Sequence, residues 1–463
     1  MRIVICASEM VPFAKTGGLA DVIGALPHAL EELGHEVVVF IPKYKEVSQS
    51  GVKLRRLNGR IFYAGVGKNI KVYFPAHDAY FNRDGLYQEK GVDYPDNLER
   101  FCYYSRRVLE QLKEINFCAD IIHAHDWQAG LIPLYLKTVY KDDPFYKKIK
   151  TLLTIHNLGY QGLFPKEEFP KLGLPSSLFT PQALEFYGRI NILKGSIVFS
   201  DIINTVSPTY SREIRSKEFG YGLEGVLGNR KEDLFGILNG IDYSIWNPET
   251  DKFILKNYSA EGIAGKKGNK EGLRKICKLK LSKDVPLFGM VSRLAGHKGF
   301  DLLIGAMEEI LKMDLEMVIL GLGDKKYETA LRHIAGKQPK KICVNFKFDD
   351  PLAHKIYAAA DIFLMPSHYE PCGLSQMISL RYGTIPLVFK TGGLADTINK
   401  ENGFIFEHYT KEALLKAISD SIEAFKMKKK WDALVLKAMQ YDFSWKEAAR
   451  RYTLLYEKAC NRK

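Results

Sequence analysis

Short apolar runs alternate with longer segments of helical period along this chain, and the whole pattern occurs twice. Apolar runs of strand length that are followed by helices and by Gly or Pro turns predict parallel strands joined by helical crossovers. The first series predicts strands near residues 2–7, 36–41, 119–124, 150–155 and 201–206, and the second predicts strands near 286–292, 315–320, 341–347, 361–365 and 385–389. The sequence therefore predicts an α/β fold with two doubly wound units in tandem.

A turn signal marks the boundary between the two units. Asn239-Gly240-Ile241-Asp242 ends the first pattern, so residues 1–243 and 244–444 are the expected domains. The stretch 256–272 is rich in Lys and Gly, which favours a flexible connection before a short helix. After the second unit, Trp445 to Ala459 has helical period, and one face carries Ala448, Tyr452, Leu455 and Tyr456.

Composition excludes several classes of protein. With 46% hydrophobic and 26% charged residues, the chain of 463 residues is neither disordered nor fibrous. No apolar stretch approaches the roughly 18 residues that span a bilayer, and the N-terminus is not typical of a signal or transit peptide. The seven cysteines are scattered and form no C-x-x-C. We therefore expect a soluble, cytoplasmic protein that does not bind to membranes.

The net charge of +13 is consistent with binding to nucleic acid, with binding to nucleotide phosphates, or with a basic surface that has no such partner. The basic clusters, Lys147-Lys148 and Lys428-Lys429-Lys430, carry no interleaved aromatic residues, which is typical of a solvated face. Nucleic acid is therefore not an expected partner.

One heptapeptide occurs twice. Lys15-Thr16-Gly17-Gly18-Leu19-Ala20-Asp21 recurs letter for letter at Lys390 to Asp396, and each copy is expected to open a helix after a strand. Two glycines at a helix N-terminus let backbone N–H groups approach a phosphate, and Lys15 would add a mobile cation. A second interpretation is that Gly-Gly only permits a tight turn. The spacing matches neither the dinucleotide nor the P-loop fingerprint.

Polar residues follow the predicted strands of the second unit. Arg293 ends the first strand and Lys298 precedes the next helix, and two cations at the carboxyl end of a strand suit a diphosphate. Glu370 lies between a strand and the Gly373 turn, where it would hydrogen-bond sugar or ribose hydroxyls. Unpartnered surface cations, and an acid that only satisfies a helix dipole, are the alternative interpretations.

Two further clusters follow strands of the first unit. His123-Ala124-His125-Asp126-Trp127 and the segment from His156 to Gly162 are expected at the edge of the sheet where the cleft lies. His123 and His125 have the spacing of a metal pair, but no third ligand is near in sequence. The chain contains no D-x-D, the usual sign of a metal-bound sugar nucleotide. We expect a diphosphate site that uses cations and helix ends and holds no metal.

These motifs resemble the glycogen and starch synthase family, retaining glucosyltransferases that elongate α-1,4-glucan from a nucleotide-activated glucose. The resemblance spans nearly the whole chain. It rests on the heptapeptide at Lys15 and on the following segments in this order: His125-Asp126-Trp127, His156-Asn157-Leu158, Asn191 to Gly195, Thr205 to Tyr210, Leu238 to Asp242, Ser292-Arg293-Leu294, Lys298-Gly299, Glu370 to Leu374 and Thr391 to Leu394.

The resemblance implies a GT-B fold, in which two Rossmann-like domains face each other across a cleft. It implies that residues 1–243 form a catalytic and acceptor domain, onto which the C-terminal helix 445–463 crosses back, and that 244–444 bind the nucleotide sugar. The implied catalytic residues are Glu370, His156, Asp126, Arg293 and Lys298. The implied donor-binding residues include Lys15, Gly17, Gly18, Asn239, Gly373, Leu374, Thr391 and Gly392, and Asp21 and Tyr160 are expected on the acceptor side.

The implied partners are ADP-glucose, or UDP-glucose, and an α-1,4-glucan such as glycogen, with no cofactor and no metal. His297 and Arg274 stand where many family members have Gln, so donor contacts near them are expected to differ. Position 378, where related transferases often carry a second Glu, is Ile378, as in the synthase branch. A glucan-binding or regulatory protein with the same fold and no turnover is the alternative, as is a glucan phosphorylase or hydrolase.

Overall fold

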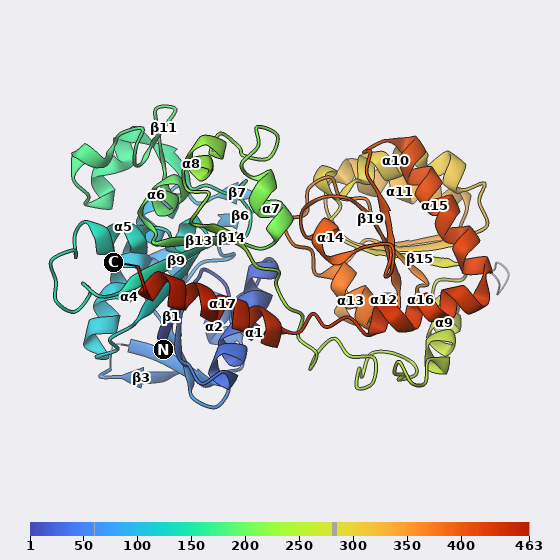
Figure 1. Ribbon diagram of the computed structural model, residues 1–463, viewed down its shortest axis with the longest axis horizontal. Helices are drawn as coiled ribbons and strands as arrows, with labels where there is room; N and C mark the ends of the chain where they lie inside the picture. Colours follow the sequence, from blue (N-terminus) through green and yellow to red (C-terminus); the bar gives the residue numbers. More distant parts are fainter. Residues whose placement is uncertain (60, 280–284, 463) are drawn as a thin grey trace. The chain divides into compact units, whose positions relative to one another are not determined.

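The computed structural model describes residues 1–59, 61–279 and 285–462. The chain divides into two compact units, one of Met1–Gly240 with Trp445–Lys463 and the other of Ile241–Ser444. Each unit is an α/β layer structure with helices on both faces of a mainly parallel sheet (Figure 1). The two-unit α/β prediction is confirmed.

The central sheet of the first unit has the strand order β14-β13-β9-β8-β1-β2-β5-β4-β3. Strands β1 (Arg2–Cys6), β2 (Glu36–Phe40), β8 (Ile121–His125), β9 (Lys150–Ile155) and β13 (Ile202–Thr205) form where the apolar runs predict them, and they are parallel. Apart from the first residues of β1, β2 and β9, their side chains are buried on both faces, which is why these runs are largely apolar. The sequence prediction misses β3 (Arg55–Leu57), β4 (Ile61–Val66), β5 (Ile70–Phe74) and β14 (Leu234–Gly236).

Helices and two small sheets complete the first unit. The helices are α1 (Gly18–Glu32), α2 (Lys45–Gln49), α3 (Asp78–Phe81), α4 (Asn97–Glu114), α5 (Leu131–Lys137), α6 (Ile192–Phe199), α7 (Pro208–Glu213), α8 (Glu224–Asn229) and α17 (Trp445–Cys460). The small sheets are β10-β12-β11 (Leu163–Pro165, Arg189–Asn191, Glu185–Phe186) and the hairpin of β6 (Gln88–Glu89) and β7 (Val92–Asp93).

Helix α17 belongs to the first unit although it ends the chain. Tyr452 and Tyr456, which the helical period places on one face, are fully buried. The Asn204 side-chain amide donates to the Tyr452 hydroxyl at 3.0 Å, and the Tyr456 hydroxyl lies 2.9 Å from Nδ1 of His123. The last helix thus packs directly beneath residues of β8 and β13.

The sheet of the second unit has the order β17-β16-β15-β18-β19-β20, all parallel. Its strands are β15 (Leu287–Val291), β16 (Glu316–Leu320), β17 (Ile342–Asn345), β18 (Ile362–Met365), β19 (Ile385–Phe389) and β20 (Phe404–Phe406), of which β20 was not predicted. Its helices are α9 (Ala264–Ile276), α10 (Phe300–Ile310), α11 (Lys325–Lys337), α12 (Asp350–Ala359), α13 (Ser375–Arg381), α14 (Gly392–Thr397), α15 (Lys411–Lys426) and α16 (Lys428–Met439).

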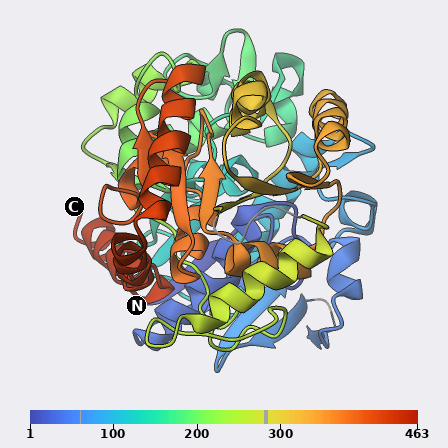
Figure 2. The ribbon, with the colours of Figure 1, turned by 90° about the vertical axis from the view of Figure 1, so that its right-hand side faces the viewer.

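The prediction of a flexible connection at 256–272 is wrong, because most of that stretch lies in α9, the yellow-green helix at the front of Figure 2. Three of its basic side chains, those of Lys266, Lys270 and Arg274, are buried. Lys270 pairs with Asp361 at 2.6 Å, and Arg274 pairs with Glu316 at 2.7 Å. From composition alone, such residues are expected to be solvated. Here carboxylates of the same unit pair with Lys270 and Arg274, which makes their burial possible.

Candidate active site

Both copies of the heptapeptide open a helix, as predicted: α1 begins at Gly18 and α14 begins at Gly392. In the first copy, however, the carboxylate of Glu9 fills the place expected for an anion. It accepts hydrogen bonds from the backbone N–H of Thr16 at 2.6 Å and of Gly17 at 3.0 Å. Those two amides are therefore engaged before any phosphate arrives, and Glu9 is a residue that sequence reasoning missed.

Lys15 and Asp21, predicted to border donor and acceptor, form an ion pair at 2.7 Å. Their side chains are 46% and 39% exposed, so water screens the ion pair. Either side chain can therefore leave the pair to contact a ligand at a small cost in free energy. The loop thus presents a cation at the start of α1 that a bound anion can recruit.

Asp126 and His156 meet at the carboxyl ends of β8 and β9. Asp126 has a left-handed backbone, with φ 54°, and its Oδ1 accepts the N–H of His156 at 2.7 Å. Burial raises the pKa of the Asp126 carboxyl to about 7, although hydrogen bonds from the backbone N–H groups of His156 and Asn157 act to lower it. The structure therefore brings these two predicted residues into direct contact.

His156 also contacts a second histidine. Nε2 of His156 lies 2.9 Å from Nδ1 of His125, and His123 follows with its ring centroid 4.0 Å from that of His125. Burial lowers the pKa of all three imidazoles, that of His156 to about 3, so they are neutral near pH 7. Among the described residues, no group of three or more His, Cys, Asp or Glu side chains is placed to hold a metal ion.

Asn239 and Tyr160 complete the predicted residues of the first unit. Asn239 is 7% exposed, and its buried Oδ1 has no hydrogen-bond partner within the described part of the chain. An unpaired buried amide oxygen costs free energy that a ligand hydroxyl can recover. Tyr160 is 61% exposed.

In the second unit, Lys298 and Glu370 form a close ion pair. Nζ of Lys298 donates to Oε1 of Glu370 at 2.8 Å and to Oε2 at 2.6 Å. Arg293 follows β15 and is exposed, and no carboxylate of the described residues lies within 4.0 Å of its guanidinium. Of the predicted cations, Lys298 is therefore held in place, whereas Arg293 is available to an anion.

Two predicted donor-binding loops of this unit pack against each other. A Cβ added to Gly392, which has φ +43°, would lie 2.0 Å from the carbonyl oxygen of Glu370, and one added to Gly393 would lie 2.0 Å from that of Cys372. Only glycine allows this approach. Thr391 is buried beside them, and Gly373, with φ +72°, turns the chain into Leu374 and α13. The loop geometry thereby fixes the position of the Glu370 backbone.

Phe348 is a second residue that sequence reasoning missed. It follows β17 at the carboxyl edge of the second sheet and is 85% exposed. An exposed ring at the edge where parallel sheets bind ligands offers a flat apolar surface to a base or a sugar. The signal in the sequence is only an aromatic between two charged residues, which is common on protein surfaces.

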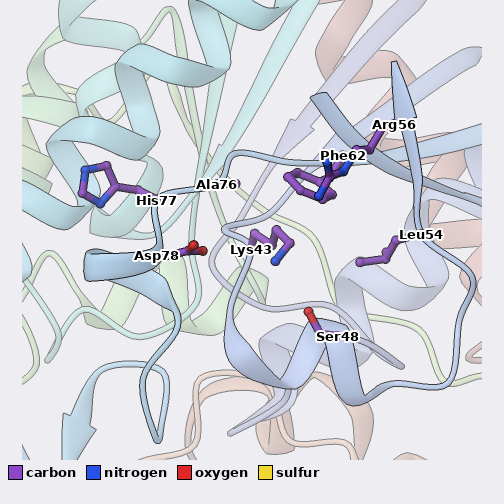
Figure 3. Close-up of a pocket in the computed structure, with 8 residues that line it drawn as sticks. All are labelled: Lys43, Ser48, Leu54, Arg56, Phe62, Ala76, His77 and Asp78. Carbon is purple, nitrogen blue, oxygen red and sulfur yellow. The ribbon is translucent and has the colours of Figure 1, made fainter. Parts of the chain in front are cut away.

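A pocket of about 450 Å³ lies apart from these residues in the first unit (Figure 3). It lies at the carboxyl ends of β2 and β5, where Lys43 and Arg56 stand 4.8 and 4.6 Å from the ring centroid of Phe62. Figure 3 shows Lys43 between Phe62 and Asp78. No residue predicted for the site lines this pocket, which consists of Lys43, Ser48, Leu54, Arg56, Phe62, Ala76, His77 and Asp78.

Comparisons with known proteins place these loops in a family. The family model described as "Starch synthase catalytic domain" matches residues 2–229, and "Glycosyl transferases group 1" matches residues 274–433. The glycogen synthase of Geotalea uraniireducens (strain Rf4) is 49% identical over 483 residues. That of Thermosipho africanus (strain TCF52B) is 47% identical over 489 residues, and both alignments cover 100% of each chain.

Solved structures agree. The catalytic domain of Starch Synthase IV from Arabidopsis thaliana, bound to ADP and acarbose, is 35% identical with a TM-score of 0.90, and the match covers 99% of each chain. Sucrose-phosphate synthase from Thermosynechococcus elongatus shares the fold, at 17% identity and a TM-score of 0.62 over 99% of this chain and 98% of that one.

Two Rossmann-like units that carry these loops define a glycosyltransferase of the GT-B fold. The relatives match over their full length, so the resemblance is not confined to the fold. The chain belongs to the glycogen and starch synthase family. In the described ranges, every helix is too short or too polar to cross a bilayer.

Proposed function

We propose that this chain transfers glucose, with retention of configuration, from ADP-glucose to the non-reducing end of an α-1,4-glucan. Full-length similarity to glycogen synthases supports the reaction, and the ADP in the related starch synthase structure favours adenine over uracil in the donor. The observation that carries the proposal is the close Lys298–Glu370 pair together with the exposed Arg293, because the two cations follow β15 and suit a diphosphate.

In this proposal, Arg293 and Lys298 stabilise the charge that develops on the β-phosphate as the glycosidic bond breaks. Glu370 accepts hydrogen bonds from sugar hydroxyls and holds Lys298 in the absence of donor. The departing phosphate takes the proton of the attacking 4-hydroxyl on the same face of the glucose. These side chains, together with the Gly373–Leu374 and Thr391–Gly392 loops, stabilise the charge of the diphosphate, so no metal is required.

The first unit holds the glucose and the acceptor. Asp126 and the neutral His156 hydrogen-bond glucose hydroxyls, and the unpaired Oδ1 of Asn239 accepts another. Gly17 and Gly18 leave the backbone at the start of α1 open to the donor, and Lys15 leaves Asp21 to contact the donor phosphate. Asp21 and Tyr160 face the acceptor.

The decisive experiment measures glucose incorporation into glycogen from ADP-glucose and from UDP-glucose at equal concentration. We expect ADP-glucose to be the better donor, with nucleotide release that depends on glucan, and we expect NMR of the product to show an α-1,4 linkage. Glucan binding without nucleotide release from either donor would instead identify a binding or regulatory protein. A faster reaction with UDP-glucose would overturn the donor assignment alone.

A further inference from the structure

Two Tyr-Gly turns in the first unit have an unusual backbone. Tyr187 and Gly188 connect β11 to β12 with φ 49° and 77°, and Tyr221 and Gly222 precede α8 with φ 50° and 83°. Turns with positive φ at both central residues favour Asn-Gly or Asp-Gly, because a bulky side chain is strained there. Tyrosine occupies the strained position in both turns, a backbone conformation that residues other than Gly, Asn and Asp rarely adopt.

Burial does not offset this strain. The Tyr187 side chain is 82% exposed and that of Tyr221 is 49% exposed, although burial is what usually stabilises an aromatic residue. The Tyr187 ring stands edge-on to that of Phe186, with centroids 4.7 Å apart. At position 187, Asn or Gly would therefore serve folding better than tyrosine, and the exposed Tyr187 ring needs another reason to be there.

The two turns lie against each other and against a third tyrosine. A Cβ added to Gly222 would lie 3.4 Å from Cε2 of Tyr187, and one added to Gly159 would lie 3.8 Å from Cζ of Tyr221. Burial raises the pKa of the Tyr221 phenol, and Tyr160, next to Gly159, is close enough to Tyr221 to raise it further. We call Tyr160, Tyr187 and Tyr221 the tyrosine cluster.

The tyrosine cluster is continuous with the loop that carries His156. That loop follows β9, and within it the Tyr160 N–H donates to the Asn157 carbonyl at 3.2 Å. The Gln161 side-chain amide donates to the Tyr221 carbonyl at 3.2 Å, which ties the second turn to the same loop. Figure 1 shows β11 and α8 at the same end of the first unit.

The exposed groups are phenols and not aliphatic side chains. Between His156 and Asn229, a stretch that the structure describes throughout, the large apolar side chains that stand out as exposed are the three tyrosines. Rings that carry hydroxyls match a sugar, which offers apolar C–H faces for stacking and hydroxyls for hydrogen bonds.

We propose that the tyrosine cluster binds the acceptor α-glucan several glucose units away from the reacting end. The inference rests on the proposed function, since it takes the loop of His156 as part of the site. Strain at Tyr187 and Tyr221 is then the cost of holding two rings rigidly toward a long chain, so that little freedom is lost when the chain binds.

The test compares Tyr187→Gly with the wild-type enzyme. Glycine removes the ring and relieves the backbone, so the melting temperature is expected to be equal or higher. The KM for maltoheptaose is expected to rise about 3- to 10-fold, since an aromatic contact is typically worth about 0.5 to 1.5 kcal/mol. The KM for ADP-glucose is expected to match that of the wild type. Tyr187→Gly combined with Tyr221→Gly is expected to multiply the effect.

Two controls isolate the ring. Tyr187→Phe keeps the stacking surface and is expected to keep the maltoheptaose KM within about twofold. Val139→Ala trims a side chain of the same unit that is 50% exposed and is expected to change neither activity nor glucan affinity.

Calorimetric titration of maltoheptaose separates this inference from the proposed function. If the enzyme transfers no glucose but Tyr187→Gly still weakens maltoheptaose binding, the tyrosine cluster is a glucan site and only the proposed function fails. Unchanged maltoheptaose KM and binding in the double variant would overturn the inference. A change in the sedimentation coefficient of the double variant without loss of glucan affinity would also overturn it, because the tyrosine cluster would then be a contact between copies of the chain.

Discussion

Replacing Lys298 by alanine tests the ion pair on which the proposed mechanism depends. Its Nζ lies 2.8 and 2.6 Å from the two Glu370 carboxylate oxygens, and the side chains are 22% and 9% exposed. A positioned group that stabilises developing charge contributes about 2.7 to 4 kcal/mol to the transition state. Since about 1.36 kcal/mol is a factor of ten, kcat is expected to fall roughly 100- to 1000-fold.

The same substitution leaves the Glu370 carboxylate without its cation. Breaking a fully buried pair costs about 3 to 5 kcal/mol of folding stability, and the partial exposure of Lys298 reduces the expected cost to roughly 1 to 3 kcal/mol. Urea denaturation measures this loss, and steady-state kinetics with ADP-glucose and glycogen measures kcat.

Glu370→Gln in the Lys298→Ala background separates the two effects. A neutral amide needs no cation, so the double variant is expected to regain stability while its kcat stays low. Wild-type kcat in Lys298→Ala would refute the reasoning. Recovery of kcat in the double variant would also refute it, because Lys298 would then only neutralise Glu370.

Three further outcomes are expected. Asp126 holds a proton up to about pH 7 when folded, whereas the unfolded chain releases it near pH 4, so its contribution to the free energy of unfolding falls as pH rises between these values. The free energy of unfolding of Asp126→Asn, measured by urea denaturation, should therefore increase relative to that of the wild type as the pH rises from 4.5 to 7.5. A difference between the two that does not change with pH would contradict this. Gly392→Ala should push the Glu370 carbonyl away and lower kcat on the order of 100-fold, whereas Gly336→Ala, with open space around its Cβ, should not. Exhaustive dialysis against EDTA should leave the transfer rate unchanged, and recovery with added Mg²⁺ of a lost rate would show that a metal takes part.

The sequence predicts the central strands of both sheets and the helix that each heptapeptide opens, because continuous apolar runs and Gly-Gly turns are local signals. It fails where partners are distant in sequence. The basic residues of α9 look solvated until Asp361 and Glu316 are placed beside Lys270 and Arg274. The amides of Thr16 and Gly17 look available to a phosphate until the fold brings Glu9 to them.

The sequence by itself determined two α/β units, the loops that bear the motifs and, through those motifs, the family. These depend on residue order, which hydrophobic period and glycine positions express directly. Only the tertiary structure decided that Glu370 holds Lys298, that burial keeps His156 neutral and that strained turns bring Tyr187 and Tyr221 together. Pairing, desolvation and backbone strain each arise between segments that meet only when the chain folds, so no local pattern records them.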